Sequence, residues 1–186
     1  MKRLVVCITV VLMLAGCGST DAQLQSVMQL RERLLQMNGC NFQAEVCANY
    51  EDSSYSFSMS CAADSQGNVT FTVVEPQSIS GISGRIHAQG GQLTFDDEVL
   101  GFPLLADGEV SPVSAPWILI RTLLGGYISS CVKEDDDLHV TMDDSYLENA
   151  MRLEVWLNGD NLPQCAEIVW QGRRVLSITV ESFEIL

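Results

Sequence analysis

The chain has few basic residues and only two histidines, and both shortages narrow what it can do. Lys and Arg number 10 against 24 Asp and Glu among 186 residues, so the formal net charge at pH 7 is −14. A surface this acidic repels phosphate backbones, and we therefore expect no nucleic acid partner. His87 and His139 each stand alone, without a second ligand at metal spacing, which argues against a zinc site.

Motifs for enzymatic chemistry are also missing. The sequence has no phosphate-binding loop and no dinucleotide fingerprint. Gly81 to Gly84 falls short of the G-x-S-x-G nucleophile elbow and lies in an expected strand. Among the many carboxylates, no pair has an apolar setting that would mark it as an acid and base. We expect a binding protein with no cofactor, no metal and no catalytic residues; an unassigned hydrolase is the alternative.

Paired C-x-x-C spacing is absent, although the chain has seven cysteines. Cys7 and Cys17 belong to the N-terminal segment; the others are Cys40, Cys47, Cys61, Cys131 and Cys165. These five are compatible with one or two disulfides in an oxidising compartment, or with free thiols in a reducing habitat, and both readings stay open. The strand registers given below place Cys47 and Cys61 on opposite faces of a sheet, so we expect no bond between them.

No apolar run is long enough to span a bilayer, but the N-terminus has a shorter one. Lys2 and Arg3 precede the run from Leu4 to Leu14, and Leu14-Ala15-Gly16-Cys17 follows it. This segment resembles the lipobox of bacterial lipoproteins, which are cut just before a cysteine. The resemblance implies diacylglycerol on Cys17 and a further acyl chain, such as palmitate, on the new amino terminus. The alternative is an ordinary signal peptide with an incidental cysteine.

The lipobox reading divides the chain into three parts. Residues 1–16 are expected to be a removed signal peptide, residues 17–23 a lipid anchor with a short linker, and residues 24–186 one domain. Two or more acyl chains hold a protein durably at a membrane. We therefore expect the protein outside the cytoplasm, tethered to the cell membrane or the outer membrane by lipid on Cys17.

Two segments have helical patterns. Asp21 to Asn38 is amphipathic, with apolar residues at three- and four-residue spacing. Ala115 to Leu124 is apolar almost all round and follows helix-start chemistry at Ser111-Pro112, so this helix must be surrounded by other elements. Gly125-Gly126 loosens or ends it, and Tyr127 to Val132 is a candidate continuation.

Most of the remaining chain alternates apolar and polar residues, which indicates roughly eight to eleven antiparallel strands. Three hairpins are expected from matching apolar faces. The first has a four-residue loop at residues 51–54, the second turns at Gly90-Gly91, and the third turns at residues 171–173. The corresponding opposed pairs are Tyr50 with Tyr55, Gln89 with Gln92, and Ile168 with Leu176.

The order of these elements and several short motifs resemble a known family. The motifs are Phe71-Thr72-Val73-Val74-Glu75-Pro76, Ile82-Ser83-Gly84-Arg85-Ile86, Gly91-Gln92-Leu93-Thr94-Phe95-Asp96 and Leu162-Pro163-Gln164-Cys165-Ala166-Glu167-Ile168. From about Leu24 to Phe183 the chain is similar to the lipoprotein-localisation factor superfamily (LolA/LolB-like). The resemblance implies a mainly β (α+β) fold, a curved antiparallel half-barrel with an N-terminal helix and an apolar helix in the concave mouth.

The resemblance also implies a function: an apolar cavity that binds lipid or acyl chains. Candidate cavity residues are Phe57, Met59, Phe71, Trp117, Ile120, Leu123 and Leu124. The competing interpretation is that these residues pack as core. The run Val99 to Leu105 is a candidate for an exposed apolar loop, or else for core. A second functional hypothesis is a protein-interaction or sensor module that binds a protein partner of the cell envelope.

Overall fold

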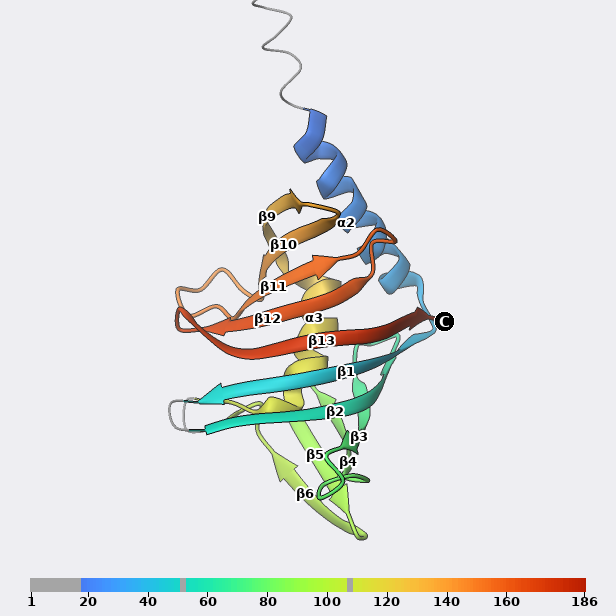
Figure 1. The fold of residues 1–186 in the computed structure, drawn as a ribbon, viewed down its shortest axis with the longest axis vertical. Helices are drawn as coiled ribbons and strands as arrows, with labels where there is room; N and C mark the ends of the chain where they lie inside the picture. The colour runs from blue at the N-terminus through green and yellow to red at the C-terminus, as the bar shows by residue number, and fades with distance from the viewer. Residues whose placement is uncertain (1–17, 51–52, 107–108) are drawn as a thin grey trace, which may run out of the picture.

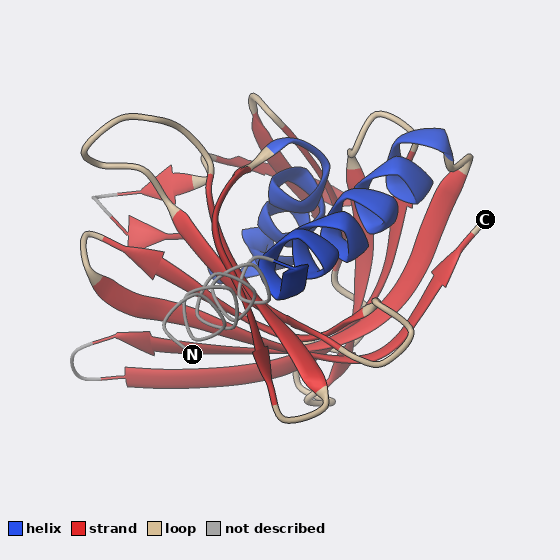
Figure 2. Ribbon diagram, turned by 90° about the horizontal axis from the view of Figure 1, so that it is seen from above, coloured by secondary structure: helices blue, strands red, loops and turns tan. Residues whose placement is uncertain are grey.

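The computed structural model describes residues 18–50, 53–106 and 109–186, so the expected signal peptide and Cys17 lie outside the described residues. An antiparallel sheet of 11 strands curves around two helices, which confirms the expected half-barrel (Figure 1). The helices are α2 (Gly18–Gln36) and α3 (Ala115–Gly125), the latter preceded by a 3-10 turn, Pro112–Ser114. Seen from above, both helices lie on the concave side of the sheet (Figure 2).

The sheet consists of two meanders that meet in its middle. The first is β1 (Gly39–Tyr50), β2 (Ser53–Asp64), β3 (Val69–Glu75), β4 (Ser83–His87), β5 (Gly90–Phe95) and β6 (Glu98–Phe102). The second is β9 (Tyr127–Glu134), β10 (Asp137–Asp143), β11 (Arg152–Leu157), β12 (Pro163–Trp170) and β13 (Arg173–Ile185). A separate pair is β7 (Leu105–Ala106) with β8 (Glu109–Val110). Strand β1 pairs with β13, so β6 and β9 form the two edges of the large sheet.

This topology explains the position of α3. After β6 the chain must travel from one edge of the sheet to the other to begin β9. Ten strand spacings of about 4.8 Å separate the edges along the sheet, and a path across the hollow is shorter. The segment that crosses is α3, and its apolar surface covers the apolar face of the sheet.

Alternating burial along the strands produces that apolar face. In β10, Leu138, Val140 and Met142 are buried while the residues between them are partly exposed. On α2 the buried stripe is Val27, Leu30, Leu34 and the following Met37, and the helix packs along β9. A single cluster unites both helices and the concave side of the strands.

The predicted hairpin registers agree with the structure in one case and differ from it in two. Ile168 does pair with Leu176, as expected. The first prediction was wrong by two residues, because Tyr50 pairs with Ser53 rather than Tyr55. Only residues 51–52 connect these strands, and both lie outside the described residues. A shift of two preserves the faces, so Cys61 remains on the buried face and Cys47 on the other.

The Gly90-Gly91 turn was also predicted wrongly. Both glycines lie in β5, where His87 pairs with Gly90, and the turn falls on the two residues before them. Gly91 pairs with Phe102 of β6, and a Cβ on Gly91 would collide with the Phe102 ring. The glycine therefore makes room for an aromatic ring rather than forming the turn.

Two further segments differ from expectation. Tyr127 to Val132 does not continue the helix but lies in strand β9, beginning directly after Gly126. Helix α2 starts at Gly18, so residues 18–23, expected as a linker, are helical. Val99 lies in edge strand β6 and is 62% exposed, so the run from Val99 to Leu105 is neither a loop throughout nor core.

Candidate binding site beneath helix α3

Helix α3 is surrounded by protein, as its composition predicts. Pro116 occupies its first turn, where a missing N–H costs no helical hydrogen bond. Its buried residues are Ala115, Pro116, Ile118, Leu119, Ile120, Thr122, Leu123 and Leu124. The helix packs against β2, β10 and β13 on the sheet and against α2 on its other side. Its contacts with the sheet are therefore mainly aliphatic and non-directional.

The structure brings the seven candidate cavity residues together. Six are buried within one cluster: Phe57, Met59, Phe71, Ile120, Leu123 and Leu124. Trp117 is partly buried and packs against that cluster. In this state the side chains of α3 fill the concave face. We still predict that the seven candidate residues line a cavity when α3 moves.

A cation from α2 holds the C-terminal end of α3. Arg31 Nε donates a hydrogen bond to the Leu123 carbonyl oxygen at 2.8 Å, and its Nη2 donates to the Gly126 carbonyl oxygen at 2.7 Å. Nη2 also lies 3.8 Å from the Met142 sulfur on β10. Burial lowers the pKa of the Arg31 guanidinium, but an arginine stays cationic in proteins. The interaction satisfies carbonyls at a helix end, where a positive charge is favourable.

The chain leaves α3 through two glycines with different roles. The Gly126 amide donates to the Thr122 carbonyl oxygen at 2.7 Å, and a Cβ on Gly126 would lie 2.6 Å from the Thr122 methyl carbon. Gly126 is therefore required by close packing. A Cβ on Gly125 would meet open space, so packing does not require a glycine at that position.

Sequence reasoning missed Arg31, although a signal was present. Val27, Leu30 and Leu34 form the buried stripe of α2, and Arg31 lies between the last two on the same side. A cation within an apolar helical stripe indicates a buried acceptor nearby. The acceptors are carbonyls 92 and 95 residues away in sequence, which no local pattern identifies.

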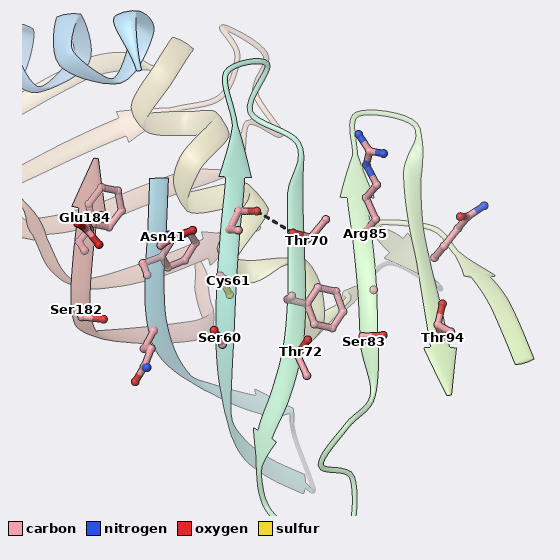
Figure 3. Close-up of a pocket in the computed structure, with 17 residues that line it drawn as sticks. Asn41, Ser60, Cys61, Thr70, Thr72, Ser83, Arg85, Thr94, Ser182 and Glu184 are labelled. Carbon is pink, nitrogen blue, oxygen red and sulfur yellow. Dashed lines mark hydrogen bonds between the residues drawn. The ribbon is translucent and has the colours of Figure 1, made fainter. Parts of the chain in front are cut away.

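The outer face of the sheet carries a separate, polar cleft of about 890 Å³ (Figure 3). It crosses strands β13, β1, β2, β3, β4 and β5. Hydroxyl and amide side chains dominate it, among them Asn41, Ser60, Thr70, Thr72, Ser83 and Thr94. The candidate residue Phe71 also lines this cleft. Most of the side chains that line this cleft are polar, which does not suit an acyl chain.

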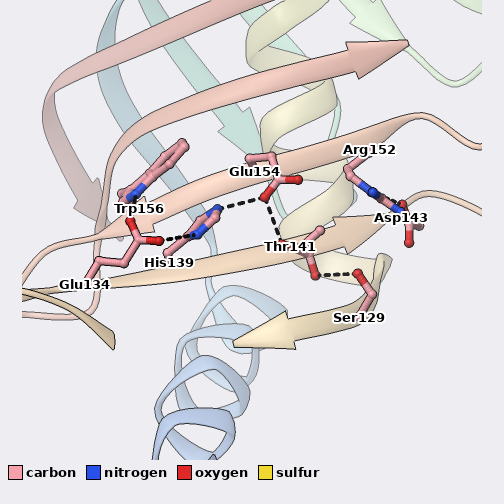
Figure 4. A network of polar contacts seen from close by, with 8 residues as sticks. All are labelled: Ser129, Glu134, His139, Thr141, Asp143, Arg152, Glu154 and Trp156. Carbon is pink, nitrogen blue, oxygen red and sulfur yellow. Dashed lines mark hydrogen bonds and ion pairs between the residues drawn. The ribbon is translucent and has the colours of Figure 1, made fainter. Parts of the chain in front are cut away.

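A polar network lies on the outer face of β10 and β11 (Figure 4). His139 Nδ1 lies 3.0 Å from Glu134 Oε1, and His139 Nε2 lies 2.7 Å from Glu154 Oε2. The His139 ring stacks on Trp156 at 4.4 Å between centroids, and Trp156 Nε1 donates to Glu134 at 3.0 Å. Which His139 nitrogen donates and which accepts depends on the tautomer of the ring. The contacts of Glu134, His139 and Trp156 tie β9, β10 and β11 together.

Within residues 18–50, 53–106 and 109–186, no three His, Cys, Asp or Glu side chains are placed to hold a metal ion. Over the same residues, no helix combines the length and hydropathy needed to cross a membrane. The five cysteines there, Cys40, Cys47, Cys61, Cys131 and Cys165, are all free thiols.

Comparisons with known proteins give structural matches only. No family model and no curated protein sequence matches the chain. A LolA superfamily protein from Nitrosomonas europaea aligns with a TM-score of 0.47 and 8% identity over 86% of this chain and 93% of its own. The lipoprotein LppX from Mycobacterium tuberculosis aligns with a TM-score of 0.43 and 11% identity over 89% and 97% of the two chains.

A third match comes from the complex of the CwlD amidase with the GerS lipoprotein from Clostridioides difficile. One chain of that structure aligns with a TM-score of 0.42 and 14% identity over 84% of this chain and 92% of its own. The solved structures that this chain resembles therefore include LolA superfamily proteins and lipoproteins, all of them distant in sequence.

Proposed function

We propose that this chain is a non-enzymatic envelope lipoprotein that binds an acyl chain in its concave face when α3 moves aside. The observation that carries the proposal is α3 itself. An apolar helix of 11 residues crosses the hollow of an open half-barrel and buries eight of those residues there. In this proposal α3 occupies the concave face when no ligand is bound, and an apolar ligand takes its place there.

The free energies make such an exchange feasible. Moving one methylene from water into an apolar site gains about 0.8 kcal/mol, so a free fatty acid of ~14 methylenes that enters from water gains roughly 11 kcal/mol. Each aliphatic side chain that leaves the core loses about 1.5–3 kcal/mol. An acyl chain therefore offsets the exposure of several residues of α3, provided that the bonds from Arg31 to Leu123 and Gly126 can break.

Membrane attachment through lipid on Cys17 is the second part of the proposal. Helix α2 begins at Gly18, one residue after Cys17, and its first turns project beyond the sheet (Figure 1). The acidic surface gives anionic headgroups little attraction, so the tether must come from acyl chains. The domain would then sit next to the bilayer.

Native mass spectrometry of the full-length chain, expressed in a bacterial envelope and purified in mild detergent, tests this function. A Cys17→Ala variant removes the covalent lipid, so any lipid mass that remains bound to it is non-covalent. We expect such a lipid, and we expect it to be displaced by a fluorescent fatty acid. Absence of bound lipid together with absence of fatty-acid uptake would rule out the acyl-chain function.

A further inference from the structure

The two edges of the large sheet are not protected equally. Strand β9 has α2 packed along it, contains Lys133 and Glu134, and has an irregular register against β10. Strand β6 pairs regularly with β5 on one side, and no described strand lies on its other side. Charges and bulges are among the usual protections of an edge strand, and β6 has neither a charged residue nor a register shift between Val99 and Phe102.

The turn before β6 determines which backbone groups point outward. Asp96 and Asp97 have φ values of 47° and 66°, as in a two-residue type I′ turn. In such a hairpin the closing pair, Phe95 with Glu98, exchanges backbone hydrogen bonds, and bonded pairs then alternate. Leu100 therefore bonds to β5, whereas the N–H and C=O groups of Val99 and Gly101 point away from the sheet.

The side chains of β6 are also exposed. Val99 is 62% and Leu100 is 66% exposed, and the two point to opposite faces because they are adjacent in a strand. Phe95, at the end of β5, is 48% exposed near the same corner. The edge thus presents unpaired backbone groups flanked by apolar surface, which is the arrangement that accepts an additional strand.

The location of β6 argues that the membrane to which the protein is tethered does not cover this strand. Helix α2 and β6 lie at opposite ends of the long axis of the molecule (Figure 1). A lipid on Cys17 would hold the α2 end at the bilayer, so β6 would face away from it. The corner beside β6 also carries Asp96, Asp97 and Glu98, which would repel anionic headgroups and attract a cationic segment.

We propose that β6 is a docking strand for an extended segment of a partner protein. The segment adds as a twelfth strand, bonds to the backbone of Val99 and Gly101, and places apolar side chains beside Val99 and Leu100. It carries Lys or Arg next to Asp96, Asp97 and Glu98, which for an antiparallel segment means at its C-terminal end. The inference does not depend on acyl-chain binding, because it uses the opposite edge of the domain.

The experiment selects binders from a displayed library of random octapeptides on the full-length chain in detergent. We expect enriched peptides that alternate apolar residues and end in basic ones. Val99→Pro removes the outward N–H and leaves the bonds of Leu100 to β5, so it should weaken a selected peptide at least tenfold. Val99→Thr keeps the N–H and should change affinity less than twofold. The Asp97→Asn variant removes one negative charge, and asparagine can adopt the positive φ at that position. This variant should therefore reduce the preference for peptides with basic residues at their C-terminal end.

Hydrogen exchange on the unmutated chain gives a readout that does not depend on the variants folding. Peptide binding should slow exchange at the Val99 and Gly101 amides and leave Leu100, which is already bonded, almost unchanged. Three results would overturn the proposal: no enriched peptide, peptides that bind Val99→Pro as tightly as the unmutated chain, or protection elsewhere. Sedimentation that shows a dimer, lost in Val99→Pro, would identify a second copy as the occupant and would also overturn it.

Discussion

The guanidinium of Arg31 bonds to the carbonyl oxygen of Leu123 at 2.8 Å and so joins the middle of α2 to the last turn of α3. The contact is partly buried. Together with the bond from Arg31 to Gly126, it is a polar interaction that must break before α3 leaves the concave face.

Replacing Arg31 with Met should loosen α3. The carbonyls of Leu123 and Gly126 lose a charged donor, which costs about 1–3 kcal/mol in the free energy of unfolding. Urea denaturation measures this cost, and stopped-flow uptake of a fluorescent fatty acid should become faster. Arg33→Met is the matched control, because Arg33 is exposed and contacts carbonyls of the loop at residues 160–161 only at 3.3–3.4 Å. Equal rates of fatty-acid uptake in the two variants would contradict the role of Arg31 in holding α3 in place.

Leu123→Ala tests the packing beneath α3. Leu123 is 1% exposed, and truncating a buried leucine costs about 2–5 kcal/mol. The space left should also raise the capacity for fatty acid. Leu35→Ala is the control, since Leu35 is 63% exposed on α2 and its loss should change stability by about 0.5 kcal/mol or less. Full destabilisation without any change in fatty-acid uptake would leave Leu123 as core only.

Cys17→Ala should move the protein from the membrane fraction to the soluble fraction outside the cytoplasm. The reason is that a chain without acyl groups has no durable anchor. Immunoblots of separated membrane and soluble fractions measure the shift. Cys7→Ala, which changes the other N-terminal cysteine, should leave the protein on membranes. If the Cys17→Ala protein also stays on membranes, the lipobox interpretation is wrong.

Thiol reactivity should separate the cysteines by face. Burial raises the pKa of Cys40 to about 11 and of Cys61 to about 12. At pH 8 both are almost entirely protonated and shielded, so an aromatic disulfide reagent should modify them only on unfolding. Cys47 lies on the outer face, where its sulfur is 3.3 Å from Ser56 Oγ, and it should react rapidly. Cys47→Ser should remove a fast phase; rapid reaction at Cys61 would contradict the register of β1 and β2.

Acid should weaken the network on the outer face. The hydrogen bond from Trp156, followed by that from His139, holds the pKa of Glu134 below its ordinary value. A lowered pKa in the folded state means that the stabilisation is complete above the unfolded pKa of about 4.3 and is lost as pH falls through the folded value. Glu134→Gln should therefore lose less stability than the unmutated chain between about pH 5 and pH 3. Glu181→Gln, at an exposed position of β13, should follow the unmutated chain in the same thermal melts.

The sequence predicted the elements better than their arrangement. Alternation in β10 and the turn expected at residues 171–173 are local signals, and both led to correct strands, although Arg173 already lies in β13 and pairs with Trp170. Ser53 and Ser54 were expected in a loop, but they extend β2. A register shift of two residues keeps every apolar residue on the same face of the sheet, so alternation alone cannot distinguish the two registers.

Long-range features were beyond local reasoning. The pairing of β1 with β13 joins the two ends of the domain, and that pairing makes β6 and β9 the edges. The apolar composition of α3 predicted a helix surrounded by other elements, and the structure places that helix in the concave face. The sequence gave no indication that Arg31 would reach Gly126, or that Val99 would lie on an open edge.

The unequal edges also limit self-association. Of the two edges that the described part of the large sheet has, β6 is open and β9 is lined by α2. Two copies that pair through β6 present only covered edges at their outer ends. Growth then stops at a closed pair, since a filament needs two usable edges on every subunit. Even when these chains are crowded on a membrane, edge pairing would yield dimers and not fibres.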